Sequence, residues 1–246
     1  MPYAVNNGVR IHFEVEGNGF PLVIQHGFTD SMETWYEIGY VDALKGKHQL
    51  ILVDARGHGR SDKPHSTSAY GKKVHVEDIL AVLHDLKIDR VDYWGFSMGA
   101  RTGYAMAQYA SQRIRSMILG GSGADGRSRI GSGSRKALKA GGAAAIAGLW
   151  GVAISESIRA RLLANDVIAL DACLVDEMGF AAVLPTMKMP CLLYVGSADP
   201  NFPAMQETAA EIPGRIGDET CRPPVRVAAN SGRRQVSRRY TRAFRR

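Results

Sequence analysis

The chain has 246 residues, of which 45% are hydrophobic and 22% are charged, with a formal net charge of +7. These proportions are those of an ordinary globular protein, and the length suits a single α/β domain. No run of about 18 apolar residues is present, so we expect no transmembrane helix. Three widely spaced cysteines without a CxxC motif exclude a disulfide framework and a cysteine-based zinc site. The first residues lack the pattern of a secretory signal, so we expect a cytoplasmic protein.

The excess positive charge lies at the end of the chain. Residues 215–246 contain ten arginines, no lysine and two acidic residues, whereas the remaining residues carry 21 basic and 22 acidic side chains. We therefore expect no nucleic-acid partner for the body of the protein. Arginine, proline, alanine, glycine and serine dominate this atypical tail, as expected when GC-rich codons are read out of frame. A selected basic tail that binds acidic partners is the alternative.

The first elements are predicted from turns and apolar runs. An Asn-Gly turn at 6–8 between two extended runs predicts a β-hairpin. Five short apolar runs, each ended by Gly or Asp, predict buried parallel strands at 21–27, 49–54, 91–95, 116–121 and 191–196. Helical periodicity follows at 72–87, where His75 and His84 are expected to face solvent, and from Met98 through Tyr109. Strands that alternate with helices predict an α/β fold with a mostly parallel central sheet and flanking helices.

The regular alternation breaks after the fourth of these runs. Residues 121–135 are mostly Gly, Ser and Arg and predict a loop, and 136–180 are Ala-rich and helix-compatible, with breaks near Gly141-Gly142 and Gly151. Because this stretch falls between two predicted strands, we interpret 122–185 as a small helical cap insertion. The predicted organisation is a core over 1–214 that includes the cap, followed by the arginine-rich tail.

The sequence Gly95-Phe96-Ser97-Met98-Gly99 stands directly between a predicted strand and a predicted helix. This is the context that a G-x-S-x-G nucleophile elbow requires, and it argues against a chance match of five residues. A sharp strand-to-helix turn strains the serine backbone, and glycine two residues to either side relieves the crowding. The serine then lies at a helix N-terminus, where partial positive charge favours a developing oxyanion.

With three further segments, the chain resembles the α/β-hydrolase family, specifically its small serine esterases, lactonases and haloperoxidase-like members. The segments are His26-Gly27-Phe28, the run DARGHGRSD at 54–62, and Gly196-Ser197-Ala198-Asp199, and they occur in the family's order. The resemblance covers roughly residues 3 to 213. It implies the α/β-hydrolase fold, hydrolysis of a small ester or lactone through an acyl-enzyme, and neither a metal nor a cofactor.

The same resemblance assigns roles to individual residues. It implies Ser97 as the nucleophile, Asp199 as the acid, and the amides of Phe28 and Met98 as the oxyanion hole. Asp125 is the alternative acid, because some members place the acid after the preceding strand. His26 and His58 are expected to be structural. A serine in the elbow argues against epoxide hydrolase and haloalkane dehalogenase chemistry, for which the family uses aspartate.

The general base of the family is missing from the sequence. That base is a histidine on a loop beyond the acid, and all seven histidines of this chain precede residue 85: His12, His26, His48, His58, His65, His75 and His84. The expected activity is therefore impaired unless one of the seven substitutes. A non-catalytic ligand-binding or sensory protein of the same fold is the alternative.

A substrate is expected to lie across the nucleophile, beneath the cap. Trp35, Phe96 and Trp150 are predicted to line the pocket, beside the oxyanion residues, with ordinary core packing as the alternative for each tryptophan. Apolar liners without a placed cation favour neutral esters over highly charged substrates. The sequence leaves the oligomeric state open, with a homodimer as one expectation.

Overall fold

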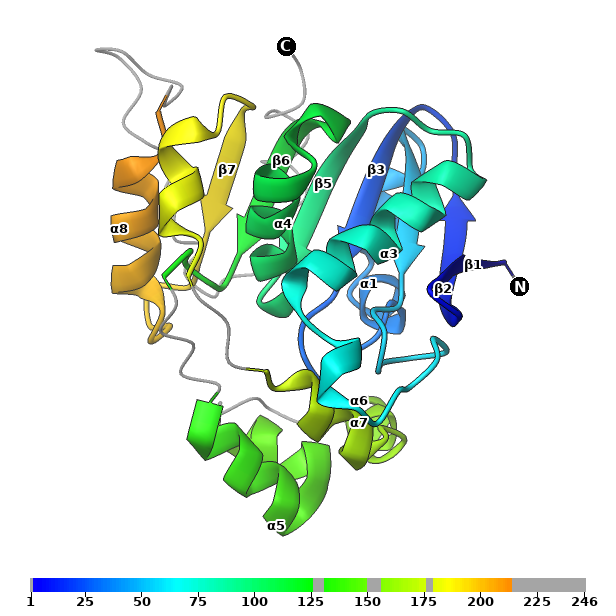
Figure 1. Cartoon of the computed structure of the whole chain (residues 1–246), viewed down its shortest axis with the longest axis vertical. Helices are drawn as coiled ribbons and strands as arrows, with labels where there is room; N and C mark the ends of the chain where they lie inside the picture. The colour runs from blue at the N-terminus through cyan, green and yellow to red at the C-terminus, as the bar shows by residue number, and fades with distance from the viewer. Residues whose placement is uncertain (1, 126–130, 150–155, 176–178, 214–246) are drawn as a thin grey trace.

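The computed structural model describes residues 2–125, 131–149, 156–175 and 179–213 (Figure 1). Within these ranges, seven strands form one sheet in the order β1-β2-β4-β3-β5-β6-β7. The strands are β1 (Tyr3–Asn6), β2 (Val9–Glu16), β3 (Phe20–Gln25), β4 (His48–Val53), β5 (Val91–Phe96), β6 (Ile114–Gly120) and β7 (Cys191–Tyr194). The predicted α/β fold with a mostly parallel sheet is confirmed.

The hairpin at the start of the chain forms the antiparallel edge of the sheet. β1 pairs with β2, and β2 pairs antiparallel with β4, whereas β4, β3, β5, β6 and β7 run parallel. Asn7 and Gly8 at the tip have φ values of 50° and 79°, as a tight hairpin turn requires. The Asn-Gly pair was therefore sufficient to predict this turn.

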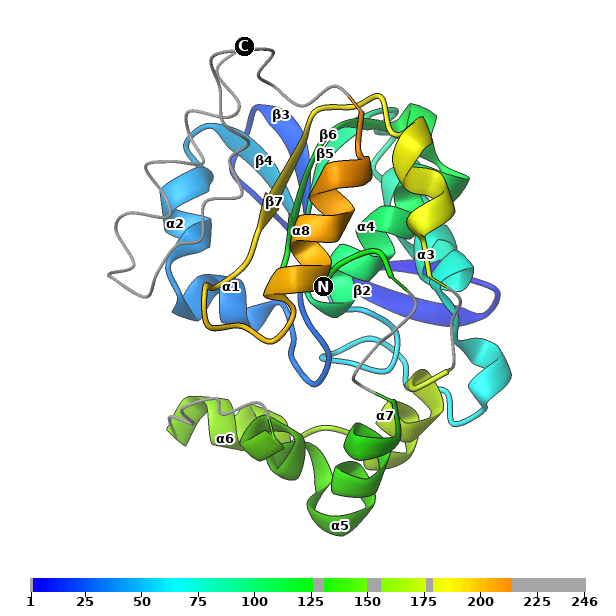
Figure 2. The same ribbon diagram turned by 90° about the vertical axis from the view of Figure 1, so that its left-hand side faces the viewer.

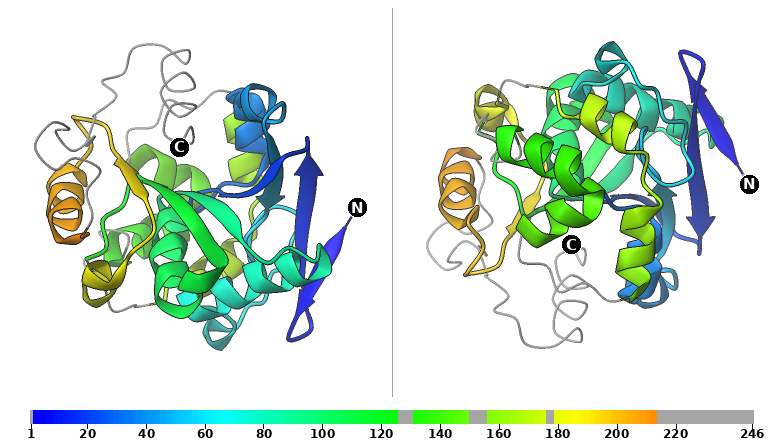
Figure 3. Two further views of the ribbon diagram at one scale, coloured as in Figure 1. Left: turned by 90° about the horizontal axis from the view of Figure 1, so that it is seen from above. Right: turned by 90° about the horizontal axis from the view of Figure 1, so that it is seen from below.

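Helices cover both faces of the sheet. The covering helices are α1 (Glu33–Glu37), α2 (Tyr40–Leu44), α3 (Lys72–Asp85), α4 (Met98–Tyr109) and α8 (Phe202–Glu211), and the described residues also form α5 (Gly131–Leu149), α6 (Glu156–Leu163) and α7 (Val167–Cys173). One core cluster joins the sheet to α3, α4 and α8, and a second joins the opposite face to α1 and α2. Two views of Figure 3 show the sheet between these layers. None of the helices within the described ranges has the length and hydropathy needed to cross a membrane.

Helices α5, α6 and α7 come from the segment between β6 and β7. They lie together beyond the carboxyl ends of the parallel strands, apart from the other helices (Figures 1 and 2). The predicted break at Gly141-Gly142 is confirmed, because both residues leave the helical conformation inside α5. Gly151 and the tail 215–246 lie outside the described residues.

Two local predictions were wrong. Helix α5 begins at Gly131, inside the segment predicted to be a loop, because tertiary packing buries Ser134 and Leu138 despite the glycine-rich sequence. His75 was expected to face solvent but is only 4% exposed, because α3 turns this side chain toward Tyr70. The other predicted surface histidine, His84, is exposed.

Candidate active site

Ser97 occupies the turn that joins β5 to α4, and its backbone is strained. Its φ of 52° and ψ of −108° lie in a region that non-glycine residues rarely adopt. The Ser97 amide donates a hydrogen bond of 2.7 Å to the carbonyl oxygen of Gly120, at the end of β6. The neighbouring strand thus holds the turn in place. Strain of this kind is typical of functional sites, where surrounding structure maintains it.

The glycines on both sides of the turn are required by close backbone contacts. A Cβ on Gly99 would lie 2.9 Å from the carbonyl oxygen of His26 and closer still to that of Gln25. A Cβ on Gly95 would overlap the backbone of Gly99 itself. The close approach of β3, β5 and α4 therefore depends on the absence of side chains at both positions, which is the physical reason for the elbow pattern.

The loop after β3 lies against Ser97. A Cβ built on Gly27 would be 3.5 Å from the Cβ of Ser97, so the backbone of this loop passes directly beside the serine. Within the described residues, no loop or cap hydrogen bond uses the amide of Phe28. The Met98 amide belongs to the first turn of α4, where N–H groups have no intrahelical acceptor. Both amides are thus suited to bind an anionic oxygen.

His26 fixes this loop and has no nitrogen left for catalysis. Its Nδ1 bonds to the carbonyl oxygen of Gly27 at 2.7 Å, and its Nε2 accepts a hydrogen bond from the amide of Ala55 at 3.1 Å. These partners assign the proton to Nδ1. The geometry supports the structural role expected for His26.

The cap contacts the same loop through polar side chains. The Nδ2 of Asn165 donates to the carbonyl oxygen of Thr29 at 3.0 Å, and Thr29 has a φ of 66°, which is unusual for a β-branched residue. Arg161 of α6 forms ion pairs with Asp30 at 2.8 Å and Glu37 at 2.7 Å. We call Asn165 and Arg161 the cap latch. No sequence signal predicted it, because its partners are more than a hundred residues apart.

The segment after β4 is organised by the buried carboxylate of Asp54. One Asp54 oxygen accepts from the Met32 amide at 2.9 Å, and the other accepts from the Arg60 amide at 2.9 Å and lies 3.0 Å from His12 Nδ1. Burial alone would raise the pKa of Asp54. The hydrogen bonds and the nearby His26 ring outweigh burial and hold this pKa below its ordinary value. This segment has a structural role.

His58 lies fully buried within that segment. Its Nδ1 is 3.0 Å from the carbonyl oxygen of Arg56, and its ring packs against those of His26 and Phe28. Burial, with a smaller contribution from His26, lowers the pKa of His58 to about 3. The ring therefore stays neutral at physiological pH and supports Phe28 from beneath.

The other histidines are engaged away from Ser97 or face solvent. His48 is the first residue of β4 and pairs with Phe20, so it lies at the amino end of the parallel strands. Ser97 instead follows the carboxyl end of β5. His65 is 2.9 Å from Asp166 of the cap. His75 lies beside Tyr70. None of the hydrogen bonds described for the seven rings reaches Ser97.

The two candidate acids follow the neighbouring strands β7 and β6. Asp199 is half-buried, and its Oδ1 accepts a hydrogen bond of 2.8 Å from the Asn201 amide at the start of α8. The Asn201 side chain in turn donates to the carbonyl oxygen of Gly121, which ties the two strand ends together. Asp125 is held through its backbone, whose carbonyl oxygen accepts from Arg101 at 3.0 Å. Both acids lie at the same sheet edge as Ser97.

An apolar cluster joins the cap to Phe28 of the loop after β3 and to Met98 of α4. Phe28 and Met98, which are 5% and 4% exposed, pack in one cluster with residues from the three cap helices. The cap residues in this cluster are Leu138, Ala143, Ile146, Leu162, Leu170, Ala172 and Cys173. The cap surface that packs against Phe28 and Met98 is therefore apolar.

The three residues predicted to line a substrate pocket differ in their surroundings. Phe96 is 43% exposed and stacks on Tyr194 beside the nucleophile. Trp35 is 3% exposed and packs against Trp94 in the core under α1 and α2, so core packing explains it and we correct its assignment. Trp150 lies outside the described residues.

Comparison with known sequences finds one family model that matches part of the chain. Residues 21–133 match the family described as alpha/beta hydrolase fold. The chain is 27% identical over 225 residues to the 2-hydroxymuconate semialdehyde hydrolase of Pseudomonas sp. (strain CF600), an alignment that covers 85% of this chain and 74% of that protein. Alignments to other curated relatives are shorter. The cis-3-alkyl-4-alkyloxetan-2-one decarboxylase of Shewanella oneidensis is 36% identical, but the chain spans only 37% of its length.

Solved structures extend the likeness over most of the chain. One described as "Est816 as an N-Acyl homoserine lactone degrading enzyme" has a TM-score of 0.76 and 25% identity, covering 98% of this chain and 97% of that one. The enol-lactonase from Burkholderia xenovorans LB400 has a TM-score of 0.75 and 25% identity, covering 87% and 88%. The sheet order, the elbow and these comparisons agree that the chain has the α/β-hydrolase fold, and residues 21–133 match the family of that name.

Proposed function

We propose that the site around Ser97 is that of a serine hydrolase for small neutral carboxylic esters or lactones, with turnover limited by the absence of a general base. The strained backbone of Ser97, beside the Gly27–Phe28 loop and at the start of α4, carries this proposal. That geometry places the serine beside two backbone amides that could bind the oxyanion of a substrate, which is the arrangement that acyl transfer uses.

The proposed reaction has two steps. Ser97 Oγ attacks the ester carbonyl carbon, and the amides of Phe28 and Met98 bind the oxyanion. The intermediate then expels the alcohol, which takes up the proton lost from the serine, and leaves an acyl ester on Ser97. Water cleaves this ester, releases the carboxylic acid and returns the serine. In both steps a base must accept a proton. We propose Asp199 as the carboxylate that would orient this base.

The substrate class follows from the surface above the serine. Phe28, Met98 and the apolar cap residues favour an acyl group without charge, and the exposed ring of Phe96 adds an aromatic surface at the entrance. A charged substrate would be desolvated there without a compensating partner. The esterase and lactonase activities in the names of the structural relatives agree with this class.

The missing base should reduce turnover strongly. In a serine hydrolase, loss of the histidine alone costs on the order of 10⁶ in kcat. An enzyme that otherwise turns over at about 10 s⁻¹ would fall to roughly 10⁻⁵ s⁻¹. Substrate binding and oxyanion stabilisation would remain.

Hydrolysis of p-nitrophenyl acetate with and without added imidazole tests the proposal. We expect slow hydrolysis by the unmodified chain and a saturable increase with imidazole, because the free base can take the place of the missing side chain. Ser97→Ala should abolish this increase. Ser66→Ala, at an exposed serine remote from the elbow, is the matched control and should retain it.

Two outcomes would contradict parts of the proposal. Ser97-dependent turnover of about 1 s⁻¹ or faster without imidazole, within the usual range of enzymes, would mean that a histidine does reach the serine. Identical rates for the unmodified chain and Ser97→Ala, with imidazole present, would contradict the proposal that Ser97 is the nucleophile of a hydrolase site. The alternative, a ligand-binding protein of this fold, would then be preferred, because the missing histidine is the observation that favours it.

A further inference from the structure

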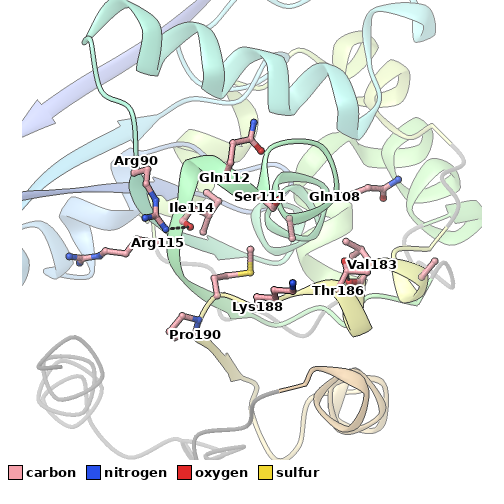
Figure 4. Close-up of a pocket in the computed structure, with 13 residues that line it drawn as sticks. Arg90, Gln108, Ser111, Gln112, Ile114, Arg115, Val183, Thr186, Lys188 and Pro190 are labelled. Carbon is pink, nitrogen blue, oxygen red and sulfur yellow. Dashed lines mark hydrogen bonds between the residues drawn. The ribbon is translucent and has the colours of Figure 1, made fainter.

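A cavity of about 800 Å³ lies at the end of the sheet opposite to Ser97. Its wall comes from the amino ends of β6 and β7, the last turn of α4, and the short 3-10 helices Ser111–Arg113 and Ala181–Thr186 (Figure 4). Volumes of this size are typical of small-molecule sites. Because parallel strands place Ser97 at their carboxyl ends, this cavity is separate from the candidate active site.

The lining of this cavity is cationic. Arg90, Arg115 and Lys188 contribute to it, and no acidic side chain among the described residues does. The Arg115 guanidinium is paired with buried Asp92 and stacks on the Phe20 ring, so its charge is largely compensated. The charges that remain for a ligand are those of Arg90 and Lys188.

Arg90 is oriented by the fold rather than left free. Its Nη2 donates to the carbonyl oxygen of Ile114 at 3.2 Å, which fixes one side of the guanidinium and leaves its other N–H groups available (Figure 4). Lys188 is exposed on the segment that leads into β7. A fixed guanidinium and a flexible ammonium across one cavity suit an anionic group with several oxygens.

The rest of the lining is part polar and part apolar. Gln108, Gln112 and Thr186 offer neutral donors, whereas Val183 and Met189 supply apolar surface. The carboxyl end of α4 brings about half a negative charge to this wall, which two full positive charges outweigh. The cavity thus combines an anion-binding edge with an apolar surface.

We propose that this cavity binds a small amphiphilic anion, with a phosphate or carboxylate head between Arg90 and Lys188 and an apolar body against Val183 and Met189. Nothing in the proposed hydrolase reaction requires this site. Its occupant would contact the start of β6 and β7, the two strands whose far ends carry the candidate acids.

Binding of n-octyl phosphate to the full chain tests the proposal, with the labelled methyl groups of methionine as reporters. Met189 lines the cavity, whereas Met98 lies at the candidate active site. We expect the Met189 methyl signal to shift in a saturable way while that of Met98 stays in place. Octanoate should bind in the same place, and octanol, which has the same chain without the charge, should bind at least about tenfold more weakly.

Charge-reversal variants distinguish binding in this cavity from non-specific attraction of the anion to a basic protein. Arg90→Glu combined with Lys188→Glu should weaken octyl phosphate binding by about tenfold or more. Lys139→Glu combined with Arg159→Glu changes the net charge equally, at exposed cap residues, and should leave binding unchanged. Equal losses in both double variants, equal binding of octanol, or a shift of Met98 in place of Met189 would each overturn the proposal. Hydrolysis at Ser97 is not part of any of these measurements.

Discussion

At the scale of single residues, the site depends on the absence of side chains at Gly95 and Gly99 as much as on Ser97 itself. Gly95 and Gly99 allow β3, β5 and α4 to approach so closely that the serine is forced into its unusual conformation. This arrangement could be predicted from the sequence, because a serine with glycine two residues to either side, between a strand and a helix, is typical of a nucleophile elbow. The requirement can be measured directly.

Gly99→Ala should destabilise the fold. The added methyl group would meet the carbonyl oxygens of two residues of β3 and its loop, and backbone atoms cannot move aside as a side-chain end can. We expect a loss of about 1–3 kcal/mol in the free energy of unfolding, measured by urea denaturation. Gly133→Ala is the control, because nothing lies within 4 Å of its added methyl in helix α5. The free energy of unfolding of that variant should rise by about 0.5–1 kcal/mol. Equal effects of the two variants would contradict this account of Gly99.

At the scale of elements, the cap is held to the core by an apolar cluster and by the cap latch. The cap latch binds the loop that carries Phe28 at Thr29, the residue of this loop with a positive φ. Periodicity and turn signals, which predict helices and strands, contain no information on a contact between residues 29 and 165. The hairpin, the parallel strands and the elbow could be predicted because their signals are local, whereas the latch could not.

Arg161→Ala should loosen the cap and the loop together. The Arg161 side chain is only 16% exposed and contacts two carboxylates. Its loss should lower the free energy of unfolding by about 1–2 kcal/mol. We expect faster amide hydrogen exchange in α6 and in the peptide that contains Thr29. Lys45→Ala removes an exposed ion pair with Asp42 and should change neither. Unchanged exchange in the Arg161 variant would show that the apolar cluster alone holds the cap.

At the scale of the whole molecule, buried neutral histidines make the fold sensitive to acid. The pKa of His58 is lowered to about 3 and that of His75 lies well below its usual value, in both cases chiefly because of burial. Between these values and the ordinary value of 6.5, the unfolded chain binds protons that the folded chain does not. Stability is therefore complete above about pH 6.5 and is lost as the pH falls.

We expect the free energy of unfolding to fall by roughly 1 kcal/mol per pH unit for His58 between pH 6 and pH 4, with a contribution of the same sign from His75. Urea denaturation at several pH values measures this slope. Asp54, whose pKa is lowered, adds to the loss only below about pH 4. His58→Gln should flatten the slope, and His84→Gln, at an exposed ring, should not. A curve without slope in this range would mean that the buried rings take up protons in the folded state.

The sequence allowed the fold and the elbow to be predicted, but not the surroundings of single side chains. His75 was placed on the surface because a helical stripe defines only one buried face, and α3 also contacts Tyr70 on another side. Trp35 was placed in the pocket as an apolar liner, with core packing as the alternative, and its ring packs in the core. Such directions depend on packing between distant segments. The cytoplasmic location, the oligomeric state and the roles assigned to Asp199 and the oxyanion amides stay predictions.

The hydrogen bond from the Ser97 amide to Gly120 also makes the turn depend on a strand that is synthesised after it. Strand β3 pairs with β5, whose residues are made about seventy positions later, as Leu22 and Asp92 show. The elbow then needs β6, which ends at Gly120. Contacts so distant along the chain form slowly, and unpaired parallel strands stay exposed meanwhile. A chain truncated before β6 would contain Ser97 without the hydrogen bond to Gly120 that holds its turn in place.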